Sequence, residues 1–160
     1  CVLSALGCEA PLVEHTQREP GALTDWQVSP SVPWREGDHY PPPPTEGWQA
    51  YDGSPAVRED SWWQVCWLDR GGVMPLGRPE AGNDVGAFAR TVLVEENEHE
   101  VVLHVGGSPP LAVWLNEELV WDGRTPHGYH PDADRFSVTL RAGENRLTVF
   151  STWLFHVSID

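Results

Sequence analysis

Short hydrophobic runs alternate with polar turns along the second half of the chain. The runs span residues 88–94, 101–105, 111–116, 119–121, 135–140 and 145–150, and they are rich in β-branched and aromatic residues. Residues typical of turns close them, such as Gly106 to Pro110, Asp122-Gly123 and Ala142 to Asn145. Strands that recur at intervals of about 8–12 residues are typical of an all-β sandwich or barrel. We therefore expect an all-β fold.

Two further segments extend this pattern. Residues 95–100 carry four glutamates and no apolar side chain, so we expect a solvated hairpin tip there. Residues 153–160 place apolar side chains at every second position, at Trp153, Phe155, Val157 and Ile159. This period of two predicts a last strand with one apolar face.

The first third of the chain looks different, because prolines interrupt it. They stand at Pro11, Pro20, Pro30 and Pro33, and then in the unbroken run Pro41–Pro44. Proline lacks a backbone N–H and fixes φ, which disfavours helices and central strands. We expect an irregular proline-rich arm over residues 1–47, with a short polyproline II rod at the run, and a sandwich over residues 48–160.

Three segments resemble the galactose-binding-like jelly roll. They are Phe88-x-Arg90-Thr91, Val113-Trp114-Leu115-Asn116 with Val120, and Phe136 to Val149 with Gly143-x-Asn145 before the last core strand. The nearest likeness is to the non-catalytic sugar-binding domain of β-galactosidase- and β-glucuronidase-type glycoside hydrolases. The resemblance implies an antiparallel jelly-roll β-sandwich that binds sugars or serves as a spacer or docking domain. It departs at Glu117, where that family usually has glycine, so the Asn116 turn must form without one.

Composition excludes several classes of function. The formal net charge of −14 disfavours binding to nucleic acid and to anionic lipid headgroups, which both require clustered basic residues. No apolar run approaches 18 residues, so no helical membrane span is expected. The plain reading of the acidity is solubility, and the alternative is an acidic face that attracts a basic partner.

The three cysteines raise the question of processing. The sequence begins at Cys1, which resembles the N-terminus of a mature bacterial lipoprotein, so we expect a lipid anchor on Cys1 in a periplasmic or cell-surface protein; the alternative is a truncated chain. Cys8 and Cys66 then form a candidate disulfide in an oxidising compartment. The alternative for Cys66 is a small buried apolar residue.

The sequence offers little catalytic chemistry. It has no Gly-x-Ser-x-Gly elbow, no phosphate-binding glycine loop and no Cys-x-x-Cys pair. The functional groups gather after Trp121, at His127, Tyr129 and His130, where Gly128 and Pro131 disfavour the helix that would align both imidazoles on a metal. We expect no enzyme activity, no cofactor and no metal.

Aromatic residues give the two functional hypotheses. Three aromatic residues lie along the arm, Trp26, Trp34 and Tyr40, and they are candidate anchors to a protein partner. They favour an accessory subunit that docks on the outer face of a membrane complex, for example a respiratory or photosynthetic one. The alternative is a carbohydrate-binding module, free or serving an enzyme on another chain. It would use Trp121, His127, Tyr129 and His130 as its ligand loop. Trp114 is expected inside the core.

Overall fold

The structure is a computed structural model. It describes residues 14–16, 21–23, 26–51, 74–75, 85–107, 110–124, 133–152 and 154–160. Over these residues the chain forms strands and loops without a helix, which confirms the all-β prediction. None of the described segments contains a helix that could cross a membrane.

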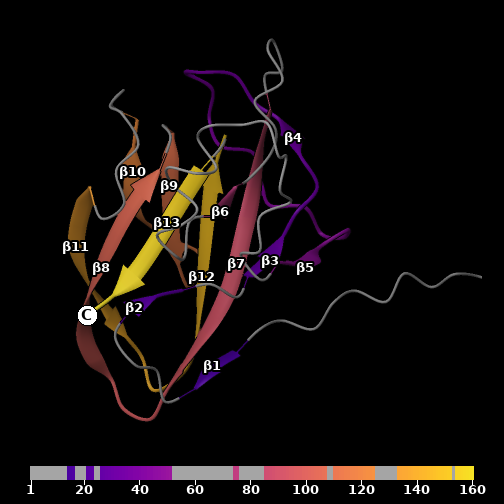
Figure 1. Cartoon of the computed structure of the whole chain (residues 1–160). Coiled ribbons are helices and arrows are strands. Elements are labelled where there is room, and N and C mark those ends of the chain that lie inside the picture. Colours follow the sequence, from indigo (N-terminus) through magenta and orange to yellow (C-terminus); the bar gives the residue numbers. More distant parts are fainter. Residues whose placement is uncertain are drawn as a thin grey trace, which may run out of the picture.

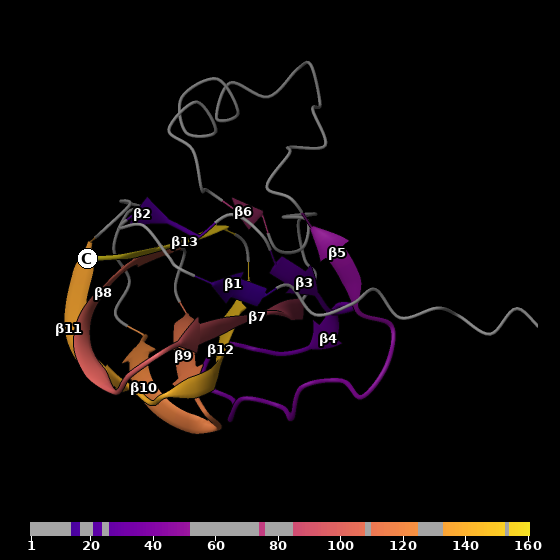
Figure 2. The same cartoon turned by 90° about the horizontal axis from the view of Figure 1, so that it is seen from below.

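Two packed sheets make up the fold (Figures 1 and 2). Sheet A has the order β10 (Glu118–Gly123), β9 (Leu111–Leu115), β12 (Gly143–Ser151), β7 (Val85–Glu95), β3 (Trp26–Val28) and β5 (Gln49–Tyr51), with β1 (Glu14–Thr16) and β4 (Val32–Pro33) also on β7. Sheet B has the order β11 (Asp134–Leu140), β8 (His99–Gly107), β13 (Leu154–Ile159) and β2 (Gly21–Ala22), with β6 (Met74–Pro75) also on β13. Among the described strands, every pairing is antiparallel except that of β1 with β7. The expected antiparallel β-sandwich is confirmed.

The main core lies between the sheets and follows the period of two in the strands. Leu93, Leu103 and Leu147 are fully buried there, and each stabilises the fold by about 1.5–3 kcal/mol relative to an exposed side chain. In the last strand Phe155, Val157 and Ile159 are also fully buried, as the alternation predicts.

The central strand β7 shows where the predicted domain boundary is wrong. β12 pairs along one edge of β7, whereas β4, β3 and β1 from the N-terminal third share the other edge. Residues 26–33, expected in a separate arm, are therefore part of sheet A. Proline did not prevent this because these strands are only two or three residues long; Pro30 lies between β3 and β4, and Pro33 ends β4.

A second, smaller core covers the outer face of sheet A. We call residues 34–48 the strap, because they cross this face between β4 and β5. Trp34 and Trp48 of the strap pack with Phe88 and Phe150 of the sheet. Trp114 packs against this cluster, with its ring centroid 5.4 Å from that of Tyr40, so the core that it was expected to join is the smaller one. Ring pairs at such distances contribute about 0.5–1.5 kcal/mol beyond their buried area.

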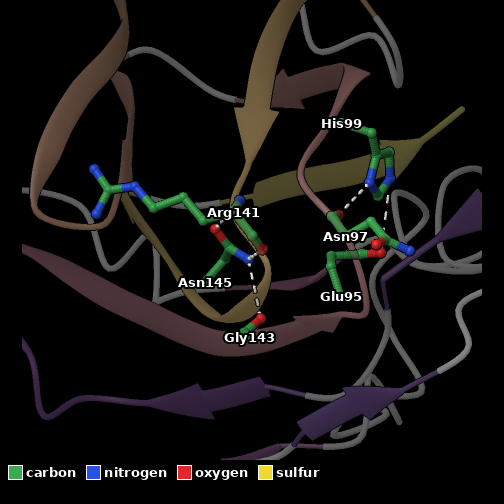
Figure 3. Close-up of polar contacts among 6 residues, drawn as sticks. All are labelled: Glu95, Asn97, His99, Arg141, Gly143 and Asn145. Atoms are coloured by element: carbon green, nitrogen blue, oxygen red, sulfur yellow. Dashed lines mark hydrogen bonds and ion pairs between the residues drawn. The ribbon is translucent and has the colours of Figure 1, made fainter.

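Gly143 and Asn145, which carry part of the family resemblance, lie at the turn between β11 and β12 (Figure 3). Asn145 is fully buried; its amide donates to the carbonyls of Arg141 (2.8 Å) and Gly143 (3.3 Å), and its Oδ1 accepts from the Arg141 N–H (2.9 Å). Oδ1 also accepts from Asn116 Nδ2 at 3.1 Å, which ties the β9–β10 turn to the β11–β12 turn. Asn116 and Glu117 adopt φ values of 50° and 70°, so the turn forms without glycine, as expected.

The predicted hairpin tip joins β7 to β8 at the same end of the sandwich as the β11–β12 turn (Figure 3). Residues 96–100 are exposed. The His99 ring lies 2.9 Å from the Asn97 carbonyl through Nδ1 and 3.6 Å from Glu95 Oε2 through Nε2. These exposed contacts order the tip and add little stability.

Candidate functional site

A candidate site lies on the outer face of sheet B, where β8 and β11 pair. Leu103 points into the core, so its neighbours Val102 and His104 point outward. On β11, Arg135 stands directly opposite His104, and Ser137 stands directly opposite Val102. Asp160 completes the set, because its N–H donates to the Val102 carbonyl at 3.1 Å and so continues β13 along β8.

These side chains surround an open hollow of about 420 Å³. Its lining residues are Val102, His104, Arg135, Phe136, Ser137 and Asp160. Val102 and Ser137 lie side by side on this face, and their side chains are shorter than those of His104 and Arg135, which also line the hollow. Its volume falls within the range of about 300–1,000 Å³ that is typical of small-molecule sites.

The polar groups of the hollow are only partly satisfied within the described part of the chain. His104 Nε2 lies 2.7 Å from Asp160 Oδ2, with the His104 side chain 20% exposed and that of Asp160 70% exposed. A pair this exposed contributes about 1 kcal/mol or less. The Arg135 guanidinium and the Ser137 hydroxyl make no hydrogen bond or ion pair with the described residues. The hollow therefore presents free donors and acceptors to a ligand.

Serine, histidine and aspartate meet here, but not in the geometry of a hydrolase. Ser137 is registered opposite Val102 rather than His104, and no hydrogen bond joins its hydroxyl to the imidazole. A serine nucleophile needs such a contact with its base. The arrangement can orient a polar ligand.

The three expected partner anchors lie within the fold of this chain. Trp26 is fully buried, with its ring 5.0 Å from Phe155 at 88°, and its indole N–H donates to the Leu23 carbonyl at 2.9 Å. Trp34 is 6% exposed and packs 5.8 Å from Phe150. The expectation that these tryptophans anchor a partner is thus corrected: the sandwich itself buries their apolar surface.

Tyr40, the third expected anchor, closes the strap over sheet A through polar contacts. Its hydroxyl donates to Asp122 Oδ1 at 2.6 Å, and the Arg124 guanidinium lies 4.3 Å from the centre of its ring. Arg124 also binds Asp122 at 3.1 Å and the Asp38 carbonyl at 3.1 Å. Burial raises the pKa of Tyr40 well above its ordinary value, and the hydrogen bond to Asp122 raises this pKa further.

The predicted ligand loop is described at one residue only. Trp121 is half-buried and stacks on Phe136, with ring centroids 5.2 Å apart and planes at 4°. Its indole N–H has no acceptor among the described residues. Trp121 thus packs at the edge of the main core. His127, Tyr129 and His130 lie outside the described residues, as do Cys1, Cys8 and Cys66, and the hypotheses about them stay predictions.

Sequence reasoning missed the hollow. Polar residues at every second position of residues 135–139, beside His104 in an apolar run, were the available signal. The pairing of β8 with β11 was needed to bring them together. In the described residues no group of three or more His, Cys, Asp or Glu side chains is placed to hold a metal ion.

Comparisons with known proteins give only low similarity. No family model and no curated protein matches the chain. A β-glucosidase from Kluyveromyces marxianus aligns at a TM-score of 0.39 and 13% identity, over 48% of this chain and 11% of that chain. An α-xylosidase of glycoside hydrolase family 31 from Xanthomonas citri aligns at a TM-score of 0.48 and 12% identity, over 93% of this chain and 15% of that chain. The chain thus spans a small fraction of these enzymes, and similarity this low assigns it no function.

Proposed function

We propose that this chain is a non-catalytic carbohydrate-binding module and that the hollow on sheet B receives a sugar ring. One observation carries the proposal: unpartnered polar groups surround a small apolar floor on a rigid sheet face. Arg135 and Ser137 offer donors, and Asp160 offers carboxylate oxygens, within one hollow. Sites built on strands hold such groups in fixed positions.

The chemistry of a sugar matches the combination of polar groups and apolar surface in the hollow. A pyranose presents hydroxyl groups, which donate and accept, together with an apolar C–H face. Val102 supplies an apolar floor, and Asp160 and Arg135 supply acceptors and donors of strong, charge-assisted hydrogen bonds. Because the hollow is open, water competes for every polar contact. We expect weak binding to one sugar and stronger apparent binding to polymers that engage several modules at once.

The docking hypothesis has less in its favour. It relied on Trp26, Trp34 and Tyr40 as anchors, and all three make their contacts inside this chain. A lipid on Cys1 concerns a residue outside the described part of the chain. The module can act alone or beside an enzyme on another chain, and both arrangements need only the exposed hollow.

Retention on immobilised glycans tests the proposal. The full chain is passed over arrays of plant, microbial and animal glycans, alone and as the variants Ser137→Trp and Arg135→Ala. Ser137→Trp fills the hollow with a bulky ring on an exposed position, so retention should disappear, and Arg135→Ala should reduce it at least tenfold. Arg141→Ala is the matched control, because Arg141 is exposed and lies beyond the hollow. Retention that survives Ser137→Trp, or none by the unaltered chain, contradicts the proposal.

A further inference from the structure

The strap contains four consecutive prolines, Pro41–Pro44. Proline fixes φ near −65° and pushes the preceding residue into an extended conformation, so the run Pro41–Pro44 favours a polyproline II rod with three residues per turn. Exposure follows this period: Pro41 and Pro44 are half-buried, whereas Pro42 and Pro43 are exposed. One ridge of the rod faces the sandwich, and the other two face solvent.

Both ends of the rod are fixed to the sandwich. At the C-terminal end the Pro44 carbonyl accepts a hydrogen bond from Trp48 Nε1 at 2.9 Å, and Arg90 lies 4.0 Å above the Trp48 ring. At the N-terminal end Tyr40 binds Asp122 and lies 5.3 Å from Phe150. The fold has therefore already ordered this segment, and a partner would not need to supply that entropy on binding.

The exposed side of the rod retains its hydrogen-bonding capacity. A polyproline II helix has no internal hydrogen bonds. The carbonyl groups of Pro42 and Pro43 accept none from the described residues. They are free to accept from an indole N–H or a phenol O–H of another protein.

We infer that Pro42 and Pro43 form a docking ligand for a protein domain with an aromatic-lined polyproline groove. Such grooves bind preformed, low-entropy polyproline II segments by packing rings between adjacent prolines and donating to their carbonyls. The charge of the strap further restricts the class of domain that could bind. Glu36, Asp38 and Glu46 are exposed on the strap together with a single exposed arginine, Arg35, so the strap is acidic and the partner's groove should have a basic rim.

Titration with labelled probe domains tests this inference on the full chain. The probes are an isolated WW domain and an isolated EVH1 domain, followed by fluorescence anisotropy. At least one should bind saturably, with affinity that falls as salt rises. The double variant Pro42→Ala/Pro43→Ala should weaken binding at least tenfold, whereas Thr45→Ala, an exposed neighbour outside the rod, should leave it unchanged.

A second variant separates loss of the ligand from loss of the fold. Glu36→Lys/Glu46→Lys keeps every proline and should weaken binding several-fold at low salt, with an unchanged thermal midpoint. Failure of both probes to bind the unaltered chain overturns the inference and leaves the rod as a packing element of the strap. Equal binding by the double proline variant overturns it as well.

Discussion

At the residue scale, the ring of Phe150 leaves no room for a side chain at Gly86. A Cβ atom at this position would overlap Phe150 of the smaller core, and Phe150 is fully buried, with Trp34 and Tyr40 packed against it. We expect Gly86→Ala to lower the free energy of unfolding by about 1–3 kcal/mol, despite the better strand propensity of alanine. Urea denaturation measures this, with exposed Thr139→Ala as the control. Equal midpoints for both variants would show that the ring is free to move.

Asn145 makes a second prediction at this scale. Replacing it with alanine leaves the Arg141 N–H, the Arg141 carbonyl and the Asn116 amide without their partner. Each unpaired group in a part-buried site costs on the order of 1 kcal/mol or more, so we expect a loss of about 2–3 kcal/mol in thermal or urea unfolding. Asn97→Ala, at the exposed hairpin tip, should change stability by less than about 0.5 kcal/mol. A small effect at Asn145 would contradict its role as the organiser of both turns.

At the element scale, the strap should respond to pH through Tyr40. The folded-state pKa of Tyr40 lies above the ordinary value of about 10, so neutral Tyr40 stabilises the strap below pH 10 and this contribution is lost as pH rises through the folded-state pKa. Tyr40→Phe keeps the ring but removes the bond to Asp122, and it should cost about 1 kcal/mol at neutral pH. Urea titrations at pH 7 to 11 measure the free energy of unfolding of the unaltered chain and of Tyr40→Phe. The difference between these two free energies should become smaller above pH 10. If the difference in free energy of unfolding grew with pH instead, the hydrogen bond from Tyr40 to Asp122 would be contradicted.

The elements also show what the sequence can predict. The long strands β7, β8, β11, β12 and β13 are rich in β-branched and aromatic residues and were predicted, as was the hairpin tip between β7 and β8. The short strands β3 and β4 were not, because two or three residues near a proline carry no period, and their pairing with β7 joins residues more than about 50 positions apart. The hollow was missed for the same reason: Arg135 and His104 meet only through the strand register.

At the scale of the whole molecule, the first third of the chain is part of the sandwich. Removing residues 9–46 deletes β1, β2, β3, β4 and most of the strap, and it uncovers Phe88, Phe150 and Phe155. We expect this deletion to abolish cooperative thermal unfolding, measured by circular dichroism and by the dispersion of amide resonances. The outcome expected from the sequence alone, in which residues 48–160 fold without the arm, would show that these contacts are dispensable.

Mapping of amide chemical shifts during sugar titration tests the central claim most directly. The full ¹⁵N-labelled chain is titrated with neutral oligosaccharides chosen from the glycan array. The proposed function predicts saturable shifts confined to Val102, His104, Arg135, Ser137 and Asp160, which line the hollow, with the strap amides unchanged. Shifts centred instead on Trp121 and residues 125–132, or no shifts with any glycan, would contradict a sugar site on sheet B.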